Sequence, residues 1–123
     1  MDSGQKDSPP SPASLAAALD RIWQRHLPEI EERLAALEVA AAATAAGTLT
    51  PEQRQAAQAA AHKLAGVLGS FGLAEGTAPA RETELHYAAE RAAGPEDGSH
   101  LTGMVAALRA LVESRNRPQT PAK

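Results

Sequence analysis

The chain has 123 residues, of which 43% are hydrophobic and 2% aromatic, and it contains no cysteine. A chain of this length forms one domain with a modest core, and the lack of cysteine excludes disulfides, thiolate catalysis and cysteine metal sites. With 12 basic against 15 acidic residues the net charge is -3, which argues against a nucleic-acid binder because such proteins concentrate positive charge.

Both ends of the sequence have the composition of disordered tails. Residues 1–11 and 116–123 are rich in proline and polar residues and offer little to bury, so we expect one folded domain over residues 12–115. The N-terminus lacks the basic region, apolar core and cleavage site of a secretory signal. No stretch approaches the roughly 18 apolar residues that span a bilayer. We therefore expect a cytoplasmic protein that does not bind membranes.

The first two predicted helices are separated by a proline. Ser11 can cap a short helix with Pro12 at its first position. Pro28 removes a backbone donor, so it is predicted to end this helix and to begin a second one that continues to Gly47. The apolar face of the short helix consists of Leu15, Leu19, Ile22 and Trp23.

The third helix has a clear start signal. Thr50-Pro51-Glu52-Gln53 is a capping box, with threonine as N-cap, proline at the first position and glutamine at the third. The helix is predicted to end at Gly72. At about 100° per residue, His62 lies opposite a single apolar stripe and is predicted to face outward. The stripe consists of Ala57, Ala60, Ala61, Leu64, Val67, Leu68 and Phe71.

Two more helices complete the predicted domain. Pro79 is tolerated only in a first helical turn, so the fourth helix is predicted to start near Thr77 or Ala78 and to run to about Ala92. A last amphipathic helix ends near Arg115. Its apolar residues are Leu101, Met104, Val105, Leu108, Leu111 and Val112.

The connections near Gly47, Gly72 and Gly94 are short, which makes successive long helices antiparallel neighbours. Alanine and leucine supply most of the packing surface, which favours closely packed helices over a sheet. The sequence therefore predicts an all-α protein, an antiparallel up-down four-helix bundle with a short extra N-terminal helix.

The face of the third helix that carries His62 is unusually poor in bulky side chains. Each of the two glycines on this face lowers helix stability by roughly 1 kcal/mol relative to alanine, so their presence calls for a structural explanation. Either a partner molecule approaches closely there, or the glycines let a neighbouring helix pack against them. The residues that share this face with His62 are Gln55, Gln58, Ala59, Ala65, Gly66 and Gly69.

The segment around His62 resembles the signature of the histidine phosphotransfer (HPt) domain family. In that family a phosphoacceptor histidine is followed by leucine at the second position, glycine at the fourth and a Gly-x-Phe-Gly-like exit. Over residues 13–115 the likeness is weaker and lies in the lengths and order of the helices. The matching positions here are His62, Leu64, Gly66 and Gly69-Ser70-Phe71-Gly72.

Two positions depart from the family pattern. Ala65 stands where many members have lysine, and Val67 stands where many have a small residue. Lys63 is a candidate for supplying the missing positive charge to a phosphoryl group, although it sits about 100° round the helix from His62 and is equally consistent with an ordinary solvated lysine.

The resemblance implies that His62 accepts a phosphoryl group from the aspartate of one receiver domain and passes it to another. A neutral, exposed imidazole suits this role. The implied partners are response-regulator receivers and a hybrid or partner sensor histidine kinase. Mg²⁺ is expected on the receiver, so the chain needs no cofactor of its own. Glu84 resembles the glutamate that orients the histidine in some relatives. The expected docking residues are Gln55, Gln58, Ala59, Ala65, Gly66 and Gly69.

Other candidate sites are weaker. Glu82, His86 and Glu90 form a row at i, i+4 and i+8, but a solvated helix face explains them better than a metal site. His26 and His100 lie near predicted helix ends and receive no function. The chain has no Walker-type loop and no kinase nucleotide motif, so we expect no autokinase activity.

Two alternatives to a relay stay open. The bundle could bind a receiver without relaying, as a sink or decoy, which the alanine at position 65 motivates. It could also be a helical adapter in which His62 is incidental. We expect a monomer, although an alanine-rich helix surface is also compatible with a dimer interface.

Overall fold

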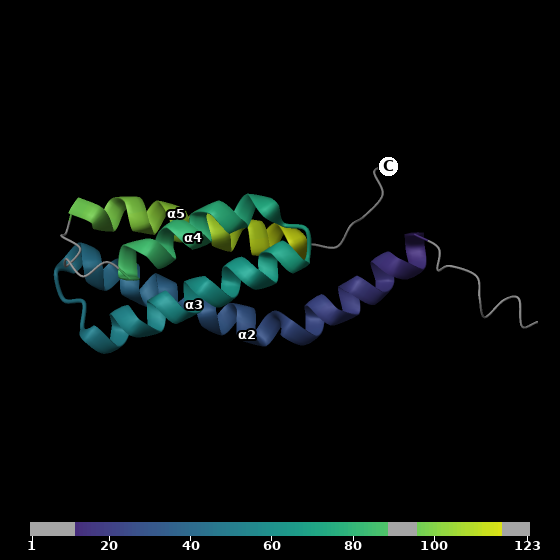
Figure 1. The fold of residues 1–123 in the computed structure, drawn as a ribbon, viewed down its shortest axis with the longest axis horizontal. Coiled ribbons are helices and arrows are strands. Elements are labelled where there is room, and N and C mark those ends of the chain that lie inside the picture. Colours follow the sequence, from purple (N-terminus) through teal and green to yellow (C-terminus); the bar gives the residue numbers. More distant parts are fainter. Residues whose placement is uncertain (1–11, 89–95, 117–123) are drawn as a thin grey trace, which may run out of the picture.

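Four helices make up the described part of the chain. The computed structural model describes residues 12–88 and 96–116, which form α2 (Pro12–Ala46), α3 (Pro51–Ser70), α4 (Ala74–Ala88) and α5 (Glu96–Asn116). Figure 1 shows successive helices running in opposite directions; α2 and α4 each pack against both α3 and α5. The predicted all-α antiparallel bundle is confirmed. The predicted end of the fourth helix at Ala92, the connection near Gly94 and the predicted tails, apart from Asn116, lie outside the described residues.

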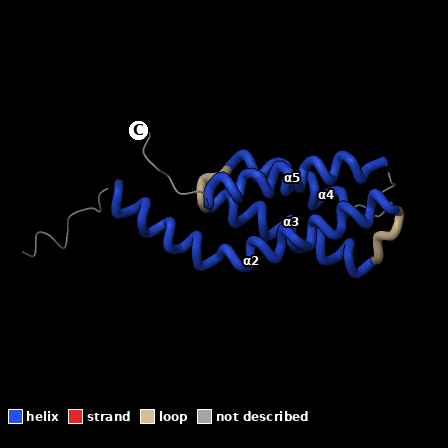
Figure 2. Tube along the Cα trace, turned by 180° about the vertical axis from the view of Figure 1, so that it is seen from behind, coloured by secondary structure: helices blue, strands red, loops and turns tan. Residues whose placement is uncertain are grey.

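The break predicted at Pro28 is wrong. α2 continues through this proline as one helix of 35 residues, so the short N-terminal helix is its first part. Pro28 removes the hydrogen bond to the Gln24 carbonyl, but both residues are exposed, so water can satisfy that carbonyl. Trp23 and Ile30 are fully buried on either side, which holds both parts of the helix on the bundle. Figures 1 and 2 show α2 bent, with its N-terminal part projecting beyond the bundle.

The helix ends follow the signals in the sequence. Gly47 and Gly72 have φ of 73° and 74°, the left-handed conformation that glycine adopts without strain. Each glycine completes a Schellman motif, in which the N–H of the next residue donates to a carbonyl five positions earlier, at 2.8 Å in both cases. The predicted capping box is also present, because the Thr50 hydroxyl accepts from the Gln53 N–H at 3.1 Å while the Thr50 N–H donates to the Gln53 side chain at 2.9 Å.

The predicted start of the fourth helix is wrong. α4 begins at Ala74, before the expected start at Thr77 or Ala78, so Pro79 lies in the second turn. The reason is the packing of Gly76, where an added Cβ would lie only 2.6 Å from a methyl group of Leu68. The helical first turn places Gly76 in this close contact, and Pro79 removes only one backbone donor from the helix.

The core lies between all four helices and contains few large aromatic side chains. Trp23 and Tyr87 are its two large aromatic residues, and leucine and alanine fill the remainder, as expected from the composition. Of the apolar stripe predicted on α3, Val67 and Phe71 are only partly buried. The fully or nearly fully buried members are Ala57, Ala60, Ala61, Leu64 and Leu68.

Side-chain contacts connect the end of α5 to α2. The Trp23 indole N–H donates to the Asn116 side chain at 2.7 Å, so the helix extends one residue past its predicted end at Arg115. The Arg115 guanidinium lies 5.2 Å from the centre of the Trp23 ring and pairs with Asp20 at 3.1 Å. Of the predicted apolar face at the start of α2, Trp23 is buried, whereas Leu15, Leu19 and Ile22 are exposed. None of the described helices combines the length and hydrophobicity needed to cross a membrane.

Candidate functional site

His62 lies in the middle of α3 and points away from the core. Its side chain is 70% exposed, while its neighbour Ala61 is fully buried. The predicted outward orientation is therefore correct. An exposed imidazole in the middle of a helix is accessible to the active site of another protein.

Glu84 on α4 contacts the imidazole. One of its carboxylate oxygens lies 2.9 Å from His62 Nδ1, and the glutamate side chain is only 22% exposed. A carboxylate at Nδ1 favours the tautomer with hydrogen on Nδ1, which leaves the lone pair of Nε2 facing outward. The contact predicted between these two residues is present, and it gives the ring a defined orientation.

The two glycines beside His62 face open space. A Cβ added at Gly66 would meet no atom within 4 Å, and one added at Gly69 would meet only the Thr77 hydroxyl, at 3.9 Å. The described helices therefore gain no close packing from these glycines. Of the two explanations offered by the sequence, approach of another molecule is the one that the geometry favours.

Ala65 is the one predicted docking residue that the structure removes from the surface. It is only 4% exposed and belongs to the core, because it lies about 40° from Ala61 and about 60° from Leu68 on the buried side of α3. Its position in the core also explains why a lysine would not suit this site in this chain. The other predicted docking residues Gln55, Ala59, Gly66 and Gly69 are exposed, Gln58 is half-buried, and Lys63 next to His62 is exposed.

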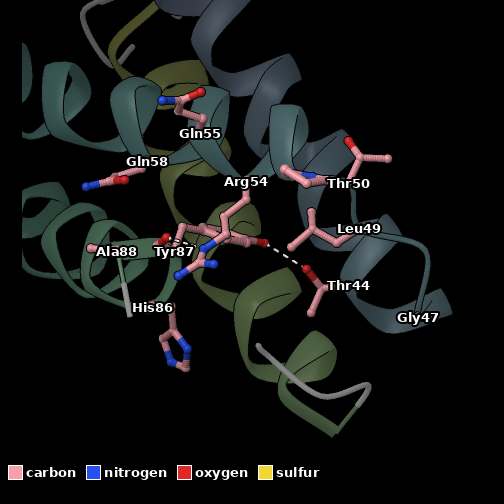
Figure 3. Close-up of a pocket in the computed structure, with 11 residues that line it drawn as sticks. Thr44, Gly47, Leu49, Thr50, Arg54, Gln55, Gln58, His86, Tyr87 and Ala88 are labelled. Carbon is pink, nitrogen blue, oxygen red and sulfur yellow. Dashed lines mark hydrogen bonds between the residues drawn. The ribbon is translucent and has the colours of Figure 1, made fainter. Parts of the chain in front are cut away.

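A groove of about 560 Å³ lies beside Gln55 and Gln58, between α3 and the end of α4. Figure 3 shows Arg54 within it, where its Nε donates to the backbone carbonyl of Tyr87 at 2.8 Å. The Tyr87 hydroxyl lies 3.1 Å from that of Thr44. Burial raises the pKa of Tyr87, and the hydrogen bond with Thr44 offsets part of this effect. No local sequence pattern indicates this groove, because its walls come from three helices.

The acidic and histidine row on α4 is only partly as predicted. Glu82 and His86 are described, whereas Glu90 lies outside the described residues. Glu82 is not simply solvated, because its carboxylate lies 2.8 Å from Nε2 of His100 on α5. His26 is exposed and lies edge-on to Phe71, with ring centres 6.3 Å apart. Sequence reasoning missed the contact of His100 with Glu82, because nothing in the local pattern around His100 reveals which side chain of α4 it faces.

Comparison with known proteins identifies the family of the chain. Residues 7–113 match the Hpt domain. The chain is 32% identical over 93 residues to Protein RcaC of Microchaete diplosiphon, an alignment that covers 76% of this chain and 14% of that protein. No solved structure gives a significant match. Because the family match spans most of the chain, the chain belongs to the Hpt domain family, the histidine-containing phosphotransfer modules of two-component signalling.

Proposed function

We propose that this protein relays a phosphoryl group through His62 between the aspartates of receiver domains. The observation that carries the proposal is the hydrogen bond between His62 and Glu84 on a face that glycines keep open. A histidine with one nitrogen held by a carboxylate and the other exposed is prepared to act as a nucleophile.

The proposed reaction balances without a further reactant. The Nε2 lone pair of His62 attacks the phosphorus of an aspartyl phosphate; the P–N bond forms as the P–O bond breaks, and the receiver carboxylate leaves. The ring then carries positive charge, which the Glu84 carboxylate at Nδ1 offsets. In the second step the carboxylate of another receiver attacks the same phosphorus, the P–N bond breaks and neutral His62 is restored.

We propose that the partner receiver supplies the metal ion for the reaction. Mg²⁺ bound by the receiver would neutralise charge on the phosphoryl group, so the chain would need no cofactor of its own. Lys63 is exposed beside His62, and we propose that it adds positive charge at the edge of the site. A hybrid or partner sensor histidine kinase would introduce the phosphoryl group, because we propose no autokinase activity for this chain.

The docking surface we propose surrounds His62 on α3, and the chain would act as a cytoplasmic monomer. Gly66 is central, because it lies one turn from His62. The space that a side chain at this position would occupy is open, which allows a receiver backbone to approach. The surface consists of Gln55, Gln58, Ala59, Gly66 and Gly69.

The test is phosphoryl transfer from a panel of phosphorylated receivers with Mg²⁺, comparing the wild type with His62→Gln. We expect an acid-labile, base-stable phosphoprotein from the wild type alone. Tight receiver binding that His62→Gln leaves unchanged, with no labelling of either protein, would favour the decoy. Failure to bind any receiver would favour the helical adapter.

A further inference from the structure

Three side chains with metal-binding atoms meet between α4 and α5. Glu82 and His86 lie one turn apart on α4, and His100 comes from the first part of α5. Each offers one ligand atom, and the three atoms lie within 4.8 Å of one another. The rings of His86 and His100 have centres 5.7 Å apart and are tilted by 55°.

This cluster is separate from the proposed phosphotransfer site. Glu84, which contacts His62, lies two residues from Glu82 and hence about 200° round the helix. Glu82 instead contacts His100 on α5. Figure 3 shows the His86 side chain pointing away from Gln55 and Gln58 on α3. Glu84 and the cluster therefore lie on different faces of α4, although His86 also lines the groove beside Gln55 and Gln58.

We propose that Glu82, His86 and His100 bind one divalent transition metal ion, with Zn²⁺ as the best fit. Two imidazoles and one carboxylate form a ligand set that zinc uses in proteins, and nitrogen ligands disfavour Mg²⁺ and Ca²⁺, which prefer oxygen. The site needs no thiolate, which matters in a chain without cysteine.

Small side-chain movements suffice for binding. At metal–ligand distances of about 2.1 Å, ligand atoms round a tetrahedral ion are about 3.4 Å apart. The Glu82 and His100 side chains are 54% and 55% exposed, so rotation about their side-chain bonds can close the remaining gap without moving the helices. The ion would take the place of the direct contact between Glu82 and His100, now 2.8 Å.

Binding would have a structural consequence. The ligands come from two helices, so the ion would clamp α4 to α5 beyond the packing of their apolar faces. With three protein ligands, a fourth position is open to water or to a side chain of another molecule. The bundle would then be more stable with Zn²⁺ than without it, because the metal binds the folded state preferentially.

The experiment uses the full, tag-free chain treated with chelator, dialysed and titrated with ZnCl₂ by calorimetry, together with thermal unfolding. We expect one Zn²⁺ per chain and a Tm that rises by several degrees in excess Zn²⁺. His100→Ala should weaken binding at least tenfold and abolish the rise in Tm. Glu82→Gln should weaken zinc binding as well. Circular dichroism of each variant shows whether it is folded.

Two matched variants make the result specific. His26→Ala removes an exposed histidine elsewhere on the bundle and should bind Zn²⁺ like the wild type. His62→Gln should also retain zinc binding while losing phosphoryl transfer, so the two proposals fail independently. Zinc affinity of folded His100→Ala equal to that of the wild type would overturn the metal site, as would loss of binding in His62→Gln or His26→Ala.

Discussion

At the scale of single residues, one hydrogen bond sets the direction in which His62 can react. The 2.9 Å contact with Glu84 occupies Nδ1, and Nε2 is left for the phosphoryl group. Glu84 is therefore a positioning residue, since it acts on the reaction through the imidazole.

Glu84→Gln is expected to slow phosphoryl transfer about tenfold, a loss of about 1.4 kcal/mol in transition-state stabilisation. The amide oxygen can still accept from Nδ1, but it lacks the negative charge that offsets the charged ring. Single-turnover transfer from a phosphorylated receiver measures the rate, and ¹⁵N chemical shifts of the His62 ring report its tautomer. The matched control is Glu75→Gln, an exposed carboxylate in the first turn of α4. Unchanged rate and unchanged ring shifts in Glu84→Gln would remove Glu84 from the mechanism.

Gly66 tests the docking surface. Gly66→Leu should fold normally, because its side chain would extend into open space, yet it should reduce transfer at least a hundredfold by blocking the receiver. Gly66→Ala should stabilise the bundle by roughly 1 kcal/mol through helix propensity. Receiver transfer kinetics and urea unfolding measure the two effects. A folded Gly66→Leu variant with near-normal transfer would show that receivers do not dock over this position.

At the scale of the helices, two glycines of α5 differ in what surrounds them. An added Cβ at Gly98 would lie 2.5 Å from the Cα of Ala45, so the start of α5 meets the end of α2 almost backbone to backbone. Gly103 has no atom within 4 Å of such a Cβ.

Gly98→Ala is expected to destabilise the bundle by about 1–3 kcal/mol, because the methyl group forces two backbones apart. Gly103→Ala, the same chemical change in the same helix, should stabilise it by roughly 1 kcal/mol. Free energies of unfolding in urea separate these outcomes. Stabilisation by Gly98→Ala would mean that α2 and α5 do not approach as described.

The contact between Tyr87 on α4 and Thr44 on α2 predicts a dependence of stability on pH. Burial raises the pKa of Tyr87 above its ordinary value of 10.0, so the unfolded chain loses the phenol proton first. The free energy of unfolding therefore has its full value below pH 10, and it declines as the pH rises towards and through the pKa of Tyr87 in the folded chain.

Absorbance of tyrosinate near 295 nm follows this group directly, because Tyr87 is the chain's one tyrosine. Its midpoint should lie above 10 in the folded protein and return to about 10 in urea. Tyr87→Phe should lower the free energy of unfolding by about 1 kcal/mol at pH 7, because one hydrogen bond is lost while Thr44 keeps its 2.8 Å bond to the Ala40 carbonyl. Above pH 10 the stability of this variant should fall less than that of the wild type. Equal midpoints in the folded and unfolded chain would contradict the buried environment.

At the scale of the whole molecule, the features readable from the sequence are those fixed by local chemistry. The capping box at Thr50, the glycines that end α2 and α3, and the outward direction of His62 all follow from neighbouring residues. The errors arose where packing between helices decides the outcome. Pro28 and Pro79 lie inside helices because buried neighbours hold those segments.

The same distinction applies to the site. The contact of His62 with Glu84 was predictable through the family resemblance, whereas the burial of Ala65 depends on where α3 meets the rest of the core. The meeting of His100 with Glu82 and His86 depends on how α5 lies against α4. Helical periodicity places a residue on a face, but it does not say which helix covers that face.

As a relay, the bundle must pass the phosphoryl group on as well as receive it. The most direct measurement loads the wild type with ³²P from a phosphorylated receiver, removes the donor, and adds a second receiver with Mg²⁺. We expect the label to leave His62 and to appear on the second receiver. His62→Gln should never carry the label, and Glu84→Gln should pass it on more slowly. Label that stays on His62, or that leaves only as inorganic phosphate with every receiver of the panel, would contradict a relay and identify the bundle as a sink.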